Sequence, residues 1–427
     1  MVEKETGMQM TTGMVRWSRG VGCSMPVGSR RARGSRCAVV SVVAVLAVVL
    51  FLAMVSMRVS ESAEVQSRLA ATPAGAKAAS AGDESSKPSD GAPSSCGRAI
   101  NNHGVVVGDN ETPDGVQRAF LWSPGDPNSG VGAHMEDLGK ADGSHLGASV
   151  ASGINDSGLV VGWVDTPGQR SAFVWDPARR DMRLLPPLSH DDLVFEAYAV
   201  NEQGFAIGDS DMVPVIWDLG REPIVCEPLL ARGEIAPHGS HAYAINRRGQ
   251  IVGWGHRLNL DPLGFLCAWN REEGKAESLS FDVANWEPWA VNDELDIAGH
   301  FYPYPVLWQV RKRQLHLLPL LDATSWGVAK GVNAQPMAVG YCGSEGPRRA
   351  CAWYFDPDMN HYLSHWAVQA LAALGGPECG SEALAVNDKG QVVGRSETAP
   401  GSGVWHACLW ERDQEGKWSI RDLGTLP

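Results

Sequence analysis

Seven segments of the chain repeat one pattern of apolar and polar positions. Each contains a small residue, then Ile or Val, then Asn, and each has a Gly seven positions after that Asn. Successive Asn residues are 41 to 54 positions apart. The seven are Asn101, Asn155, Asn201, Asn246, Asn292, Asn333 and Asn387. Self-similarity at this period is typical of solenoids, propellers and other arrays of small units.

Each repeat predicts four short β-strands. The first ends at the Ile/Val-Asn pair, the second is a Gly-bounded Val/Ile run, the third ends in Trp, and the fourth is rich in Leu. Such runs, separated by Gly, Asn and Asp turns, indicate strands rather than helices. We interpret the recurring Trp as a packing position. It is occupied by Trp122, Trp175, Trp217, Trp269, Trp308, Trp353 and Trp410.

The link between the first two strands is an Asn-x-x-Gly turn in most repeats. The Asn side chain can bond the turn backbone, and Gly accepts a positive φ. Glu294-Leu295 and Gln335-Pro336 interrupt this motif in the fifth and sixth repeats. We therefore expect those two turns to differ from the others.

The repeats predict an all-β, seven-bladed β-propeller made of seven units of about 47 residues, in a domain spanning 96–427. Small residues recur in each first strand, for example at Gly97 and Ala99. With a strand period of 2 they would lie on one face, which suits innermost strands crowded near an axis. A pair of β-sandwiches or an open β-solenoid is the alternative architecture.

The combination of Ala-Ile-Asn-x-x-Gly-x-Val-Val-Gly, Ala-Phe-Leu-Trp and Asp-Leu-Gly-Thr-Leu resembles the bacterial HAF repeat, named for a His-Ala-Phe triplet. The resemblance covers 97–427. Only His406 keeps the His of the triplet, and only Phe120 and Phe173 keep its Phe. The resemblance implies an extracellular repeat protein, and it supplies no catalytic residue that could be transferred.

The N-terminal fifth of the chain has the features of a targeting region. Residues 1–36 are basic. Residues 37–57 contain no charged residue, and this segment is long enough to cross a membrane as a helix. We expect a basic cytoplasmic segment, a single-pass anchor and a flexible Ala/Ser/Pro/Gly linker at 58–95, with the body in the periplasm or outside the cell. A cleaved signal peptide would instead release the body, and Met25 is a second plausible start.

Charge and motifs limit the chemistry that we expect. Residues 97–427 carry 25 basic and 42 acidic groups, which argues against nucleic-acid binding. The sequence contains no Gly-x-Ser-x-Gly nucleophile motif, no His-Glu-x-x-His zinc-protease motif and no Gly-Lys-Ser/Thr phosphate loop. No spacing of Cys and His residues suggests a metal site. We therefore expect no catalytic motif, metal or cofactor. Cys267, Cys351 and Cys408 occupy a core position, which predicts buried thiols. A Cys342–Cys351 disulfide is the alternative for one of them.

One position varies within an otherwise uniform frame, directly after the Gly of the second strand. Its occupants are Asp109, Trp163, Asp209, Trp254, His300, Tyr341 and Arg395. We call these seven residues the variable ring and expect them at a strand end, partly in solvent. Exposed aromatic and charged groups suit recognition of a carbohydrate, peptide or protein partner. The sequence therefore predicts a binding or scaffolding module, with a hydrolase or lyase acting on extracellular polysaccharide as the alternative.

Overall fold

The structure is a computed structural model that describes residues 92–125, 132–139, 147–229, 239–256, 262–278, 286–322, 326–343, 346–357 and 365–426. All of these belong to one compact unit, Ser85–Pro427. Residues 1–36, the expected anchor at 37–57 and nearly all of the linker lie outside the described residues. Within the described ranges, no helix is long and apolar enough to cross a membrane.

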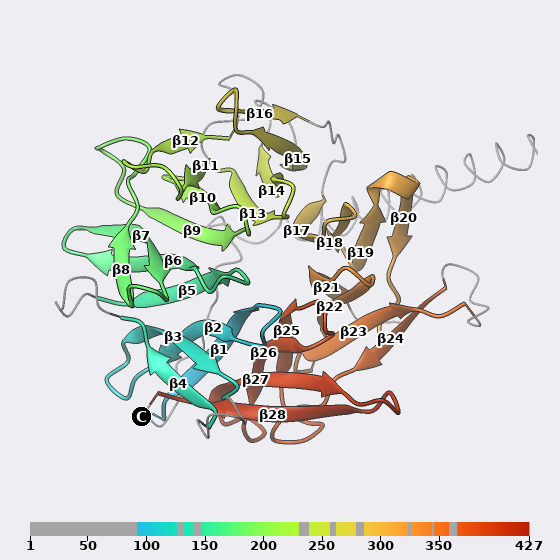
Figure 1. Cartoon of the computed structure of the whole chain (residues 1–427). Coiled ribbons are helices and arrows are strands. Elements are labelled where there is room, and N and C mark those ends of the chain that lie inside the picture. The colour runs from blue at the N-terminus through green and yellow to red at the C-terminus, as the bar shows by residue number, and fades with distance from the viewer. Residues whose placement is uncertain are drawn as a thin grey trace, which may run out of the picture. The chain divides into compact units, whose positions relative to one another are not determined.

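Seven antiparallel sheets of four strands surround a common axis (Figure 1), and we number them as blades 1 to 7. Blade 1 contains β1 (Ser94–Ile100), β2 (Val106–Glu111), β3 (Gln117–Ser123) and β4 (His134–Asp137). Blade 2 contains β5 (Ser149–Ile154), β6 (Val160–Thr166), β7 (Gln169–Asp176) and β8 (Asp181–Leu184). Blade 3 contains β9 (Phe195–Val200), β10 (Phe205–Ser210), β11 (Val213–Asp218) and β12 (Cys226–Pro228).

The remaining blades follow in chain order. Blade 4 contains β13 (His241–Ile245), β14 (Gln250–His256), β15 (Pro262–Asn270) and β16 (Lys275–Ser278). Blade 5 contains β17 (Glu287–Val291), β18 (Asp296–Phe301), β19 (Tyr304–Gln309), the 3-10 turn η1 (Val310–Lys312) and β20 (Gln314–Leu317). Blade 6 contains β21 (Trp326–Val332), β22 (Met337–Gly343), β23 (Arg349–Phe355) and β24 (Trp366–Ala370). Blade 7 contains β25 (Ser381–Val386), β26 (Val392–Glu397), β27 (Trp405–Arg412) and β28 (Trp418–Gly424).

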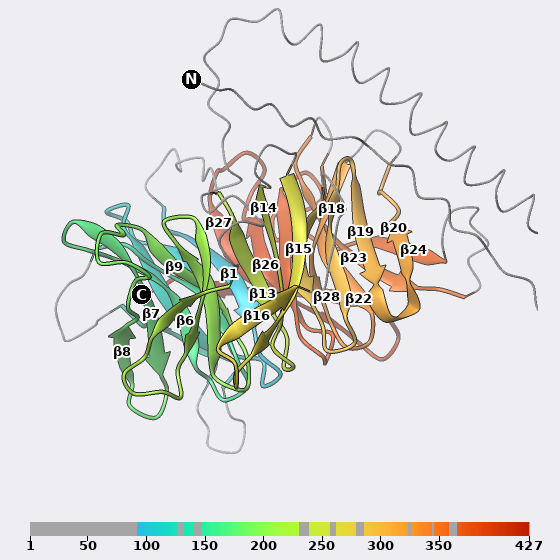
Figure 2. The same cartoon turned by 90° about the horizontal axis from the view of Figure 1, so that it is seen from above.

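The ring of blades is closed. The first strands of consecutive blades contact one another, including β25 with β1, and the strands run across the thickness of the ring (Figure 2). Seven apolar clusters fill the seven seams between neighbouring blades, and one of them joins blade 7 to blade 1. Ser95 accepts a hydrogen bond from the Ala407 amide and donates one to the Gly424 carbonyl oxygen across that last seam. The predicted seven-bladed propeller is therefore confirmed.

A β-bulge interrupts the first strand of every blade. In blade 1 Gly97 pairs with Gly108 and Ala99 pairs with Val107, so Arg98 is an extra residue without a partner. The same shift occurs in the other six blades. Because Gly108 and Val107 are adjacent, Gly97 and Ala99 lie on opposite faces of the sheet. The expectation that these small residues share a face is wrong, because it assumed unbroken alternation.

The bulge explains why Gly recurs seven positions after each Asn. A Cβ built on Gly108 would lie 1.8 Å from the Cys96 carbonyl oxygen, and one on Gly340 would lie 1.9 Å from that of Val328. Equivalent positions in the other blades would meet the same carbonyl at 1.9–2.4 Å. Only Gly leaves room for the bulged backbone.

The two interrupted turns behave differently from each other. Leu295 adopts a φ of 61°, close to the positive φ of Gly104 and its counterparts, and its amide donates to the Asn292 carbonyl as in the Gly turns. The expectation of a different turn in the fifth repeat is therefore wrong. Pro336 has no amide hydrogen to donate and cannot adopt a positive φ, so the sixth turn does differ, although the Asn333 amide still bonds the Met337 carbonyl.

The recurring Trp residues pack in the seams between blades in all seven repeats, as expected. Trp122, Trp175, Trp217, Trp353 and Trp410 are buried, whereas Trp269 and Trp308 are partly exposed. The indole Nε1 of Trp217, Trp353 and Trp410 donates to a carbonyl of the preceding blade at 2.7–2.8 Å. These hydrogen bonds tie consecutive blades together.

The cysteines follow the prediction of buried thiols. Cys267, Cys351 and Cys408 are buried and free, and burial raises the pKa of the Cys267 thiol to about 12. Cys342 is also a buried free thiol, and its hydrogen bond with Cys351 lowers its pKa. The alternative disulfide between these two residues is not formed in this structure.

Candidate functional site

At one end of the axis, the seven repeat Asn residues form a closed ring of hydrogen bonds. Each Nδ2 donates to the backbone carbonyl of the Asn in the next blade at 2.9–3.2 Å, and Asn387 returns to Asn101 at 2.9 Å. Each Oδ1 accepts the amide four residues later. We call these seven residues the Asn ring. Both the Nδ2 and the Oδ1 of each side chain are engaged in hydrogen bonds that hold the turns and the blades together.

A cavity of about 190 Å³ opens at the Asn ring. Its wall includes the Ile or Val that precedes each Asn, and polar residues form its rim. Carboxylates of the rim accept amide hydrogens from the preceding blade, for example Asp156 from Asn102 at 2.7 Å and Asp293 from Arg247 at 2.9 Å. These acids therefore have a structural role. In the ranges that the structure describes, no three His, Cys, Asp or Glu residues are placed to hold a metal ion.

The variable ring occupies one register position in all seven blades. Each member lies on the second strand and pairs with the first-strand residue two positions before the bulge residue. In blade 1, for example, Asp109 pairs with Cys96, and the bulge residue is Arg98. Its neighbour on the third strand is always Ala, Gly or Pro. The expectation of a strand end was wrong, because the strands continue beyond this position. Asp109 and Asp209 are buried, and the other five are partly exposed.

The structure does not join the members of the variable ring directly, and each bonds or stacks on other residues. Arg98 forms an ion pair with Asp109, Arg395 with Glu382 at 2.9 Å, and His300 approaches Glu287 at 3.8 Å. The aromatic members contact other rings or guanidinium groups. These contacts are Trp163 with Arg170, Trp254 with His241, and Tyr341 with Trp326 and Arg348.

A second variable series was missed in the sequence, and it lies closer to the axis. It consists of the bulge residues, which we call the bulge ring. They are Arg98, Ser152, Tyr198, Tyr243, Trp289, Lys330 and Leu384. Their signal was visible, because in every repeat one variable residue stands between two small ones or between Pro and Ala. The unbroken period of 2 hid its meaning.

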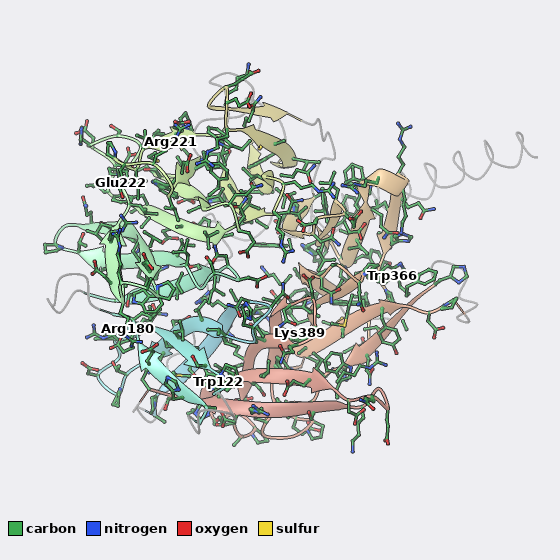
Figure 3. The ribbon with its side chains drawn as sticks, viewed as in Figure 1. Trp122, Arg180, Arg221, Glu222, Trp366 and Lys389 are labelled. Carbon is green, nitrogen blue, oxygen red and sulfur yellow. The ribbon has the colours of Figure 1, made fainter. Side chains whose placement is uncertain are left out.

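Bulge residues of consecutive blades contact one another. The rings of Tyr198 and Tyr243 lie 6.2 Å apart, those of Tyr243 and Trp289 stack at 4.3 Å, and the Lys330 Nζ lies 3.0 Å above Trp289. In contrast, Arg221 and Glu222 lie at the outer rim of the ring (Figure 3). The bulge therefore aims side chains of blades 3 to 6 into one group around the axis.

Carboxylates surround this aromatic group in blades 3 and 4. The Tyr198 hydroxyl lies 3.0 Å from Glu196 Oε2 and 2.9 Å from Asp209 Oδ2, and Asp209 also contacts Nδ1 of His241. One hydroxyl hydrogen can serve only one of the two carboxylates. Burial, with Asp209 and Glu196 beside it, holds the pKa of Tyr198 well above its usual range. The carboxylate that Tyr198 does not serve keeps another partner, which is Arg170 for Glu196 and His241 for Asp209.

The His241 ring extends the aromatic group outward. It stacks with Tyr243 at 5.9 Å and with Trp254 at 6.4 Å between ring centres. Burial and the charges of Glu287 and Asp209 raise the pKa of Tyr243, so its hydroxyl stays protonated. The Nε1 of Trp289 and the Nε2 of His300 are buried and have no hydrogen-bond partner among the described residues.

Lys330 lies between the carboxylates of blades 5 and 7 and the guanidinium groups of blades 1 and 6. Burial lowers its pKa to about 7, Arg348 and Arg98 add to this, and Glu287 and Glu382 oppose it. Arg348 and Arg395 hold Glu382 between them at 2.6 and 2.9 Å. We call the group formed by these residues the axial cluster. It comprises Arg98, Glu196, Tyr198, Asp209, His241, Tyr243, Glu287, Trp289, Lys330 and Glu382.

The fold, the Asn ring and the bulge ring define the class of this protein. It is a seven-bladed β-propeller with polar and aromatic side chains gathered at its axis. No protein-family model matches the chain, and no curated protein matches it.

Solved structures match the fold. One is a post-proline cleaving enzyme from Rickettsia typhi, with a TM-score of 0.50 and 10% identity over 81% of this chain and 54% of that chain. Another is the β-propeller domain of the Trilobed protease from Pyrococcus furiosus, described as having an open velcro topology, with a TM-score of 0.50 and 11% identity over 76% and 93%. The chain spans about half the length of the first of these proteins. Identities this low show a shared fold alone.

Proposed function

We propose that the protein is a binding module whose ligand contacts the axial cluster. The observation that carries this proposal is the variation of the bulge ring within a uniform frame. Packing positions repeat the same residue types from blade to blade, whereas the bulge ring contains Arg, Ser, Tyr, Trp, Lys and Leu. A polar and aromatic group of this kind suits recognition of a carbohydrate, peptide or protein.

Unmatched polar atoms support the same proposal. Trp289 Nε1 and His300 Nε2 are buried and have no hydrogen-bond partner among the described residues. Buried polar groups in folded proteins are nearly always paired, so groups left without partners are candidates for ligand contacts.

Two matched Trp substitutions test the proposal. The purified full-length chain is screened against glycans, cell-wall polymers and peptides. Any ligand found is then titrated against Trp289→Leu, in the axial cluster, and Trp269→Leu, a partly exposed Trp of blade 4 outside it. We expect Trp289→Leu alone to weaken binding at least tenfold. Equal affinity of the two variants would place the ligand elsewhere and refute the proposal.

The second candidate function is hydrolysis or elimination on an extracellular polysaccharide, and a specific contact favours it. Asp209 holds the Nδ1 side of His241, which orients the other ring nitrogen as a general base would require. His241→Gln would then reduce turnover of the substrate by a much larger factor than it weakens binding. Absence of product from every polymer that binds would remove this candidate.

We further propose that the body is exported, as the resemblance to HAF-repeat proteins implies, and that the uncharged run at 37–57 anchors it. A reporter active only in the cytoplasm, fused after residue 96 of the chain, should be inactive. Activity of that fusion would contradict the proposed orientation, and release of the body into the medium would identify a cleaved signal peptide.

A further inference from the structure

We propose that the axial cluster recognises an organic cation, such as an alkylammonium group, and that the ammonium of Lys330 occupies the place of that cation on Trp289 when no ligand is bound. This inference rests on the proposed binding function and names the chemical class of the ligand. It is carried by three features of the cluster: its aromatic faces, its carboxylates and the position of Lys330.

The first feature is a continuous aromatic surface. Tyr198, Tyr243 and Trp289 follow one another around the axis, and His241 and Trp254 extend the stack. The π-face of Trp, followed by that of Tyr, attracts cations through the ring quadrupole. An uninterrupted group of aromatic faces favours a cation with an apolar surface. The charge of such a ligand is attracted to the rings, and its alkyl groups make apolar contacts with them.

The second feature is the charge beside those rings. Glu196, Asp209 and Glu287 line the aromatic side of the cluster. Arg170 pairs with Glu196 at 2.8 Å, whereas Glu287 has only His300, 3.8 Å away, as an ion-pair partner given by the described structure. Asp209 contacts Nδ1 of His241. A ligand cation would therefore compensate mainly the charge of Glu287, which has the most distant ion-pair partner of the three acids.

The third feature is the cation already on the ring. The Nζ of Lys330 lies 3.0 Å from the centre of Trp289, so this face accommodates an ammonium group. The charged groups that act on Lys330 are Glu287 of β17, Glu382 of β25, Arg98 of β1 and Arg348 before β23. Burial, with Arg348 and Arg98, lowers the pKa of Lys330 to about 7, and the two carboxylates oppose this shift. Near neutral pH little free energy is needed to discharge Lys330, so an incoming cation displaces it readily.

The test uses choline and its uncharged isostere 3,3-dimethyl-1-butanol, titrated into the full-length chain in a non-ionic detergent. We expect choline to bind and the alcohol not to bind. Trp289→Leu should weaken choline binding about tenfold or more, as expected for a partly desolvated cation–π contact. Trp269→Leu is the matched control and should leave choline binding unchanged.

The pH dependence isolates Lys330. Choline keeps its charge at every pH, whereas a competing Lys330 with a pKa of about 7 discharges between pH 6 and 8, so wild-type affinity should rise about tenfold over this range. Lys330→Met should bind choline about tenfold more tightly than wild type at pH 6 and lose that rise. His241 and His300 face the same cluster, so the result is taken from the difference between wild type and Lys330→Met.

The outcomes separate this inference from the function on which it rests. Equal binding of the neutral isostere, no binding of choline, or an affinity unaffected by Lys330→Met would overturn the inference. If a neutral glycan binds and Trp289→Leu abolishes its binding, the cation is wrong but the binding site stands. If no ligand responds to any substitution in the axial cluster, both proposals fall.

Discussion

The Asn ring directly follows the seven first strands, and the bulge ring lies three residues earlier within them, yet the two rings differ in every other respect. The Asn ring repeats one residue seven times, and each member makes the same hydrogen bond to the next blade. The bulge ring has six residue types at seven positions, and its contacts change from blade to blade. The identical residues of the Asn ring close the fold, while the different residues of the bulge ring occupy the site where we propose recognition.

The difference has a backbone cause. At the Asn ring, the turn and the neighbouring blade use both ends of the amide side chain. At the bulge, the extra residue has no partner on the second strand, so no pairing requirement restricts its side chain. The Gly opposite the bulge pays the whole steric cost, because no Cβ fits there. The backbone thus fixes the residue type at the Asn and Gly positions of each blade, whereas the residue type at the bulge position can vary.

The largest loss of stability should come from removing the room that the bulge needs. Gly340→Ala would place a Cβ 1.9 Å from the Val328 carbonyl oxygen, so the backbone of β21 must shift. We expect a loss of about 3 kcal/mol in the free energy of unfolding, measured by chemical denaturation. Gly132→Ala is the control, because no atom lies within 4 Å of its Cβ position. A neutral Gly340→Ala would show that the bulge does not depend on Gly.

An intermediate effect is expected at the Asn ring. Asn292→Ala removes the bond to the Asn333 carbonyl at 2.9 Å and the acceptor for the amides of Glu294 and Asp296. A loss of about 2–3 kcal/mol should follow from leaving buried groups unpaired. Ser152→Ala, in the bulge ring, should stay within about 0.5 kcal/mol. Similar losses at both positions would erase the distinction between closure and recognition.

The last predicted change is a gain in stability rather than a loss. Lys330 has a lowered pKa of about 7 in the folded state, so the unfolded chain binds more protons between that value and the ordinary lysine pKa. Its destabilising contribution is complete below pH 7 and fades as the pH rises. Lys330→Met should therefore stabilise the protein by up to about 4 kcal/mol at pH 7, less any cost of packing the Met side chain, and by less at pH 9. Stabilisation that is independent of pH would show that Lys330 packs poorly rather than being held against its charge.

The sequence predicted the architecture well because the frame residues repeat. Asn, Gly and Trp recur where backbone and packing demand them, and seven recurrences of four strands lead directly to seven blades. Leu295 was mispredicted because the surrounding hydrogen bonds of Asn292 impose a positive φ that the residue itself disfavours. The hydrogen bonds of a turn therefore outweighed local preference.

The candidate site was predicted only in part. The variable ring was found because its residue types vary, and five of its members are partly exposed as expected. Its neighbours Tyr198, Tyr243, Trp289 and Lys330 were missed, since they depend on a bulge that breaks alternation. The contacts between them join residues 41 to 46 positions apart, such as Tyr243 with Trp289 and Trp289 with Lys330, and no local pattern reports such contacts.

Every sheet of this propeller is built from four strands that are consecutive in the chain, including the last, so no strand of blade 1 completes blade 7. Each blade is consequently encoded by one continuous segment of the chain, which contains its repeat Asn, the Gly opposite the bulge and one bulge residue at the axis. Duplication or exchange of a single repeat would transfer one bulge residue together with the backbone that presents it at the axis. The chemistry at the axis can therefore be reassembled one seventh at a time, without redesigning the way in which the circle closes.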